Sequence, residues 1–144
     1  MRHAILLTLL PLALAACAPS PSPEPGGPPT MGHGMTVVNV TATYRERILL
    51  TPGHVLKVRV EDVSLADAPA RVLAEHTETL DGGAPPYHVT LGFPSSQIDP
   101  RHTYAVRAEI RDPGGALRFT TDTRHAVLTH GAPASADIVL VAVR

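Results

Sequence analysis

The sequence predicts an all-β fold: a single β-sandwich domain of about seven to eight short, mostly antiparallel strands that follows a disordered Pro-rich tether. Three observations carry this prediction. Apolar and polar residues alternate with a period of two through much of residues 36–144, as they do in half-buried strands. Runs of Asp, Pro and Gly separate the alternating segments at hairpin-like spacing. No convincing helical period continues for more than about two turns.

The first element is a secretory signal peptide over residues 1–16, which we expect to be removed. A positive start at Arg2 precedes an apolar run over residues 4–13, and small residues follow that run. The run is far shorter than the ~20 residues that a membrane-spanning helix needs, so we interpret it as a targeting signal and not as a transmembrane anchor.

Cys17, the only cysteine of the sequence, directly follows Leu14-Ala15-Ala16. Small residues before a cysteine predict a lipoprotein signal, in which the thiol is acylated and the chain is cut before it. Two or more acyl chains hold a protein stably on a membrane. We therefore expect the membrane to be a partner through the acyl chains on Cys17. Ala18 is not the aspartate that retains many lipoproteins in the inner membrane, which favours a place in the cell envelope on the periplasmic face of the outer membrane.

The second element is a Pro/Gly-rich tether over residues 17–35. Prolines at alternate positions block helix formation and sheet pairing, and so favour open coil and polyproline II. The six prolines of this tether are Pro19, Pro21, Pro23, Pro25, Pro28 and Pro29.

The third element is the β-sandwich domain, residues 36–144. Its predicted strands lie at 38–44, 56–61, 71–80, 87–93, 104–111, 116–121, 126–128 and 138–143. On two neighbouring strands, apolar residues should face the core and arginines the solvent, because a slip of one residue would bury the arginines. The inward set is Val58, Val60, Val106 and Ile110, and the outward set is Arg59, Arg107 and Arg111.

Charge and cysteine content exclude several classes of function. Removal of residues 1–16 takes away one arginine and leaves 11 basic against 13 acidic residues, a formal charge of −2. This balance gives no basic footprint for nucleic acid. Once Cys17 is acylated, the domain has no thiol for a disulfide, a thiolate metal site or a nucleophile.

Several ordered blocks of the domain resemble the YbaY/YscW lipoproteins. They lie at residues 40–53, 58–70, 86–93, 98–110 and 117–122, and the most specific part is Asp62-Val-Ser-Leu-Ala-Asp-Ala-Pro69. The resemblance implies a β-sandwich lipoprotein, and its YscW branch comprises type III secretion pilotins, which escort a secretin subunit to the outer membrane. It thus implies a non-enzymatic protein that binds or escorts another envelope protein such as a secretin. No residue of the sequence marks the binding surface, and an unpaired edge strand is the expected docking place.

Polar residues of the domain do not form a catalytic pattern. Asp62, Ser64 and Asp67 are expected to serve turn chemistry, with Asp62 accepting backbone hydrogen bonds. The histidines lack a zinc-binding spacing and are expected to be scattered over the surface, and no nucleophile elbow or phosphate loop occurs. We therefore predict no catalytic residue, no cofactor and no enzymatic activity.

One segment supports an alternative function. Met31, His33 and Met35 offer two thioethers and an imidazole, soft ligands that suit Cu(I), and the intervening glycines would let them converge. The alternative is therefore a periplasmic lipoprotein that binds copper or a small ligand through this segment.

Overall fold

The structure is a computed structural model and describes residues 34–144. These residues form eight strands and one short 3₁₀ helix, and no helix among them could span a membrane. The elements in chain order are β1 (Met35–Tyr44), β2 (Val55–Asp62), β3 (Arg71–Thr79), β4 (Tyr87–Pro94), η1 (Ser95–Gln97), β5 (Tyr104–Arg111), β6 (Leu117–Thr120), β7 (His125–Val127) and β8 (Ser135–Ala142).

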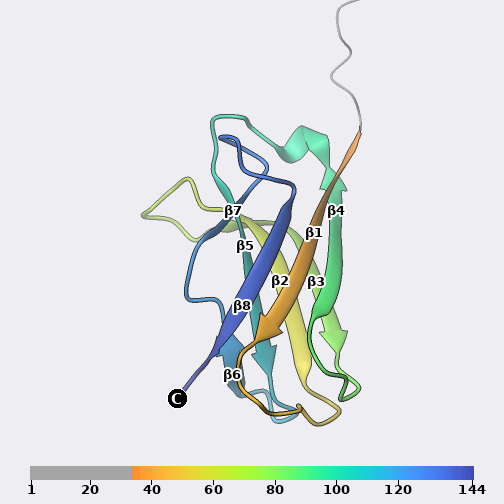
Figure 1. The fold of residues 1–144 in the computed structure, drawn as a ribbon. Helices are drawn as coiled ribbons and strands as arrows, with labels where there is room; N and C mark the ends of the chain where they lie inside the picture. The colour runs from red at the N-terminus through yellow and green to blue at the C-terminus, as the bar shows by residue number, and fades with distance from the viewer. Residues whose placement is uncertain (1–33) are drawn as a thin grey trace, which may run out of the picture. The chain divides into compact units, whose positions relative to one another are not determined.

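The strands pair in the order β3-β2-β5-β6-β8-β1-β4, and β7 pairs with β5. One layer holds β3, β2, β5 and β6, and the other holds β1 and β4. Strand β8 belongs to both layers, because it pairs with β6 at one end and with β1 along residues 135–140. The pairing of β8 with β1 is parallel and every other pairing among the described strands is antiparallel (Figure 1). The result is a sandwich that closes almost into a barrel, which confirms the all-β prediction.

The core lies between the two layers and follows the predicted alternation. Val60 lies opposite Val106, and Leu56 lies opposite Ile110, on β2 and β5. All four side chains are at most 2% exposed. A stacked pair of rings, Tyr44 and Phe119 with centroids 4.8 Å apart, joins β1 to β6 across the interior.

The outer side of β2 and β5 carries the predicted arginines. Arg107 and Arg111 are exposed, and Arg59 is half-buried because it pairs with Glu61 at 3.2 Å. Ala105, on the same outer side, is only 7% exposed. The loop over residues 121–124 borders a hollow with Ala105, so this end of the outer face is covered by chain that period-two alternation does not reveal.

Two turns show why the chain reverses where it does. Gly53 has a φ of +96°, which a residue with a side chain rarely adopts, and its N–H donates to the Leu80 carbonyl at 2.9 Å. Between β5 and β6, one carboxylate oxygen of Asp112 accepts from the N–H groups of Gly114 and Ala116 at 3.0 and 2.9 Å. These bonds replace the sheet ladder where the strand ends.

Candidate functional site

The candidate site begins at the seam between β3 and β4, the two end strands of the sheet order. These strands contact each other, but no backbone ladder joins them, and each pairs on one side only among residues 34–144. The connection over residues 80–86 links them at one end of the seam. At the other end β3 begins at Arg71, while β4 leads directly into η1. The seam therefore leaves backbone N–H and C=O groups without strand partners, and such edges accept an added strand.

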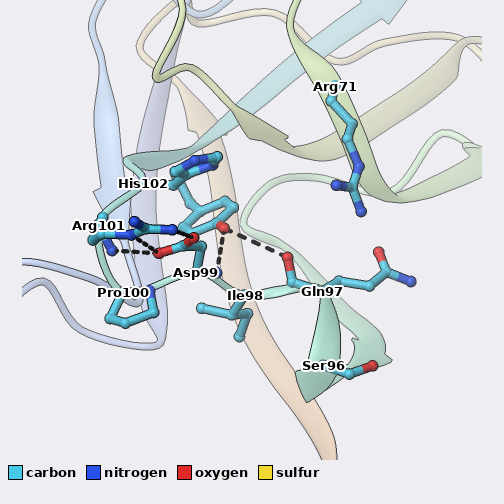
Figure 2. Close-up of a pocket in the computed structure, with 9 residues that line it drawn as sticks. Arg71, Ser96, Gln97, Ile98, Asp99, Pro100, Arg101 and His102 are labelled. Atoms are coloured by element: carbon cyan, nitrogen blue, oxygen red, sulfur yellow. Dashed lines mark hydrogen bonds and ion pairs between the residues drawn. The ribbon is translucent and has the colours of Figure 1, made fainter.

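A depression of about 610 Å³ opens where β3 begins and η1 ends. Its walls come from β3, η1 and the loop that precedes β5 (Figure 2). The lining residues are Arg71, Ser96, Gln97, Ile98, Asp99, Pro100, Arg101, His102 and Tyr104. It is thus a polar hollow at the mouth of the seam.

Asp99 and Arg101 form a two-bond ion pair on one wall of this depression. Arg101 donates from Nε to Oδ1 of Asp99 at 3.0 Å and from Nη2 to Oδ2 at 2.7 Å. The side-chain and backbone hydrogen bonds from Arg101 hold the pKa of Asp99 well below its usual range. The charges of Asp99 and Arg101 therefore compensate each other.

Tyr104 supports the same wall from the core side. Its ring is 1% exposed, and its hydroxyl accepts from the Asp99 N–H at 2.8 Å. The hydroxyl also lies 3.5 Å from the Gln97 carbonyl, to which it donates. One buried phenol thus fixes the backbone on both sides of Ile98.

A second network lies behind the depression and centres on Asp62, the last residue of β2. Oδ1 accepts from the Ser64 N–H at 3.0 Å and from the Ser64 hydroxyl at 2.6 Å, and Oδ2 lies 2.6 Å from Nδ1 of His102. Ser64 Oγ in turn accepts from the Thr103 N–H at 2.8 Å. These bonds join the loop after β2 to the loop before β5. We call Asp62, Ser64 and His102 the clamp.

The clamp changes the acidity of its carboxylate. Partial burial opposes ionisation of Asp62, but the hydrogen bonds from Ser64 and His102 outweigh it, so the pKa lies below its usual value. From the other side, the Thr129 hydroxyl donates to the His102 carbonyl at 2.7 Å. Thr129 follows Leu128, whose φ of +72° is rare for a residue with a side chain. Backbone strain of this kind persists only where surrounding contacts enforce it.

The clamp contains serine, histidine and aspartate, but it is not arranged for nucleophilic catalysis. In a catalytic triad the serine hydroxyl gives its proton to the histidine, and the aspartate orients the far side of the ring. Here the Ser64 hydroxyl donates to Asp62 instead, and its lone pair is used by Thr103. The geometry supports a structural role, as the sequence predicts for Asp62 and Ser64. Asp67, expected in the same turn, has no hydrogen bond to Asp62.

Most of the residues singled out from the sequence as sites lie outside the described part of the chain. Cys17, Met31 and His33 all precede residue 34. Met35 is the first residue of β1, pairs with Pro94 across the sheet and is 65% exposed. Among residues 34–144 no group of three or more His, Asp or Glu side chains could hold a metal ion.

Two histidines depart from the expected surface scatter. His54 is 8% exposed, and its Nδ1 lies 2.8 Å from the Thr51 carbonyl. His102 belongs to the clamp and lines the depression. The placement of His102 has no local sequence signal, because Asp62 lies 40 residues away in the chain, whereas the partner of His54 is only three residues away.

The two outer faces of the sandwich differ in charge. The face of β2, β3 and β5 holds ion pairs of Lys57 with Glu75 and of Arg111 with Glu109, at 3.4 and 3.2 Å. The face of β4, β1 and β8 is formed mainly by Thr, Val and Asn, with Asp137 as its one carboxylate among the described residues. Ion-paired faces are usually solvated, whereas the depression holds polar groups beside an open sheet edge. The depression is therefore a better candidate site than the ion-paired face.

Comparisons with known proteins place these features in context. Residues 33–140 match the family model described as "Type III secretion system lipoprotein chaperone (YscW)". The chain is 35% identical over 107 residues to the uncharacterized lipoprotein YbaY of Escherichia coli (strain K12), which covers 74% of this chain. It spans 55% of the length of that relative.

A solved structure is also similar. It is an alternative pilotin from the type II secretion system of Vibrio cholerae, 37% identical, with a TM-score of 0.74. The match covers 77% of this chain and 99% of the pilotin chain.

Proposed function

This chain belongs to the YscW family of type III secretion system lipoprotein chaperones, and on that basis we propose that it is a pilotin-like envelope lipoprotein whose β-domain binds and escorts another envelope protein. The partner class is a secretin subunit. The observation that carries the proposal is the likeness of the whole domain to a type II secretion pilotin, at 37% identity and a TM-score of 0.74. At that identity, the likeness supports a related task as well as a shared fold.

The seam supports binding over catalysis. It offers free strand edges on β3 and β4 and a polar depression at its mouth, which together suit an extended peptide segment. The carboxylates near the depression already have partners within the domain. Asp99 is paired with Arg101, and Asp62 accepts hydrogen bonds within the clamp. A general acid or base needs a group free to exchange its proton with a substrate, so we propose no enzymatic reaction.

Escort to a membrane requires an anchor. We propose that acyl chains on Cys17 supply it, and that residues 18–34 act as a spacer between the bilayer and the domain. The lipoprotein names of the matched family and of the Escherichia coli relative support this proposal. A domain held at the periplasmic face of the outer membrane would deliver its partner there.

The test is recovery of the partner from detergent-solubilised envelopes of the native host. Wild-type protein should bring down one envelope protein in stoichiometric amount, identified by mass spectrometry. That partner should lose its outer-membrane location in cells that carry only Cys17→Ser protein. A partner whose location does not depend on Cys17 would contradict the escort role.

The same preparation tests the alternative function. Stoichiometric copper that is lost when Met31 and Met35 are both replaced by leucine would favour a metal-binding lipoprotein. Copper-free protein that still recovers its partner would favour the pilotin-like role.

A further inference from the structure

Arg71, the first residue of β3, forms no ion pair with any side chain of the described chain. It lies directly opposite Asp62 in the pairing of β2 with β3. In an antiparallel pair, opposite charges at facing positions ordinarily attract each other. Here Asp62 already accepts from Ser64 and His102, and none of the ion pairs between residues 34–144 includes Arg71.

The side chain of Arg71 is directed instead toward the depression. Figure 2 shows it extending from the start of β3 toward Gln97 on the opposite wall. The Gln97 side chain makes no hydrogen bond to another residue in the described part of the chain. The backbone carbonyl of Gln97, by contrast, accepts a hydrogen bond from the Tyr104 hydroxyl. Arg101, the other arginine of the depression, is neutralised by Asp99. The depression is therefore lined by one guanidinium without an ion-pair partner and, on the opposite wall, by one side-chain amide without a hydrogen bond among the described residues.

We propose that Arg71 and Gln97 form a carboxylate subsite that takes one aspartate or glutamate side chain of an extended partner segment lying along the free edge of β3. A guanidinium offers a planar fork of donors that matches a carboxylate, and the Gln97 amide supplies a further donor. The extended backbone follows from the unpaired strand edge that begins at the same residue. This inference rests on the proposed function, since it names how the escorted protein is held.

Charges farther along β3 restrict where that acidic side chain can sit. Glu75 pairs with Lys57 at 3.4 Å, and Glu78 lies 3.6 Å from Nε2 of His76. Because Lys57 compensates Glu75, it is Glu78, toward the far end of β3, that would repel a second acidic residue of the partner, since like charges at facing positions are unfavourable. The subsite thus selects a segment with its acid at one end of the contact and neutral residues beyond it.

The test uses the full lipidated protein in detergent micelles and fluorescein-labelled hexapeptides of alternating valine and threonine with capped ends. One probe carries a single aspartate and its matched probe carries asparagine at the same place. Fluorescence anisotropy should show that wild-type protein binds the aspartate probe about fivefold more tightly, as an exposed ion pair allows. Arg71→Gln should remove this preference.

Two further variants make the assignment specific. Arg107→Gln removes an exposed arginine from the outer face of β5 and should keep the full preference. Arg71→Glu should reverse it, so that a probe with lysine in place of aspartate binds more tightly. Equal binding of the aspartate and asparagine probes to wild-type protein, or a preference that survives in Arg71→Gln, overturns the subsite.

The subsite and the proposed function fail in different ways. If envelopes yield the partner but the probes show no preference, or do not bind, the escort role stands and the subsite is wrong. If the probes behave as expected but no partner is recovered, the subsite stands and the escort role is wrong.

Discussion

Oδ2 of Asp62 lies 2.6 Å from Nδ1 of His102, although 40 residues separate the two along the chain. The contact joins the end of β2 to the loop that forms one wall of the depression. It also occupies the carboxylate that faces Arg71 across the sheet. The clamp therefore fixes the wall, while Arg71 forms no ion pair with the carboxylate that it faces.

Asp62→Asn should weaken the clamp. Asparagine keeps the size of the side chain but replaces one acceptor oxygen with an NH₂ group, which accepts no hydrogen bond, so the contact with either Ser64 or His102 loses its acceptor. We expect the free energy of unfolding to fall by about 1–2 kcal/mol, as for a hydrogen bond to a charged group near the surface. Urea titration followed by circular dichroism measures it. Asp67→Asn is the control, since Asp67 is exposed and should change stability by less than about 0.5 kcal/mol.

The clamp should also make stability depend on acidity. Partial burial raises the pKa of Asp62, but hydrogen bonds from Ser64 and His102 prevail and place it below its usual value. A carboxyl with a lowered pKa in the folded state stabilises the fold above its unfolded pKa, and this contribution is lost as the pH falls through the folded pKa. The advantage of wild-type protein over Asp62→Asn should therefore be full above about pH 5 and shrink below about pH 4. A difference in unfolding free energy that is the same at pH 7 and pH 3 would contradict this account.

The clamp also marks the limit of what the sequence could predict. Alternation placed the strands and their faces, because a residue's direction on a strand depends only on its neighbours in the chain. A short-range bond such as Asp62 to Ser64 was within reach for the same reason. The partner of Asp62 on the other side, His102, lies on a loop that only the pairing of β2 with β5 brings near.

Arg71 was hidden for a related reason. The sequence shows an arginine at the start of a strand, where it is normally solvated or paired. That it forms no ion pair with Asp62, which lies opposite in the sheet and contacts His102 from 40 residues away, is a relationship that no local pattern contains. The seam between β3 and β4 also required the complete strand order, since either strand could have been central by composition.

Ile110→Ala should strongly destabilise the domain. Ile110 is fully buried opposite Leu56, and its truncation leaves a cavity that close packing cannot fill. We expect a loss of about 2–5 kcal/mol in the free energy of unfolding. Arg107→Ala, on the exposed side of the same strand, should stay within about 0.5 kcal/mol. Denaturant titration measures the free energy of unfolding of both variants. A larger loss for Arg107→Ala would contradict the assignment of Ile110 to the core face and of Arg107 to the solvent face.

The tether should contribute little to the stability of the domain. Because β1 begins at Met35 and the Gly34 carbonyl accepts from Ser95, the shorter chain should begin at Gly34. It should unfold at the same temperature as a chain that begins at Ala18, because a segment dense in proline has few ways to pack on a sheet. Differential scanning calorimetry of the two chains tests this. A markedly lower melting temperature for the shorter chain would mean that residues 18–33 dock on the domain.

Cys17→Ser should release the protein from membranes. Serine cannot form the thioether that attaches the diacylglyceryl group, so the chain would lose the only anchor that its sequence predicts. Fractionation of cell envelopes should move the protein from the membrane pellet to the soluble fraction.

Ala18→Asp is the matched change at the neighbouring residue, because it keeps the lipidated cysteine and alters only the residue after it. In a host that retains lipoproteins with aspartate at this position, Ala18→Asp protein should remain membrane-bound but move from the outer to the inner membrane on a sucrose gradient. Retention of Cys17→Ser protein in the pellet would show that something other than the lipid holds it. A common shift of both variants to the soluble fraction would show that the region near the cut, and not the acyl chains, controls location.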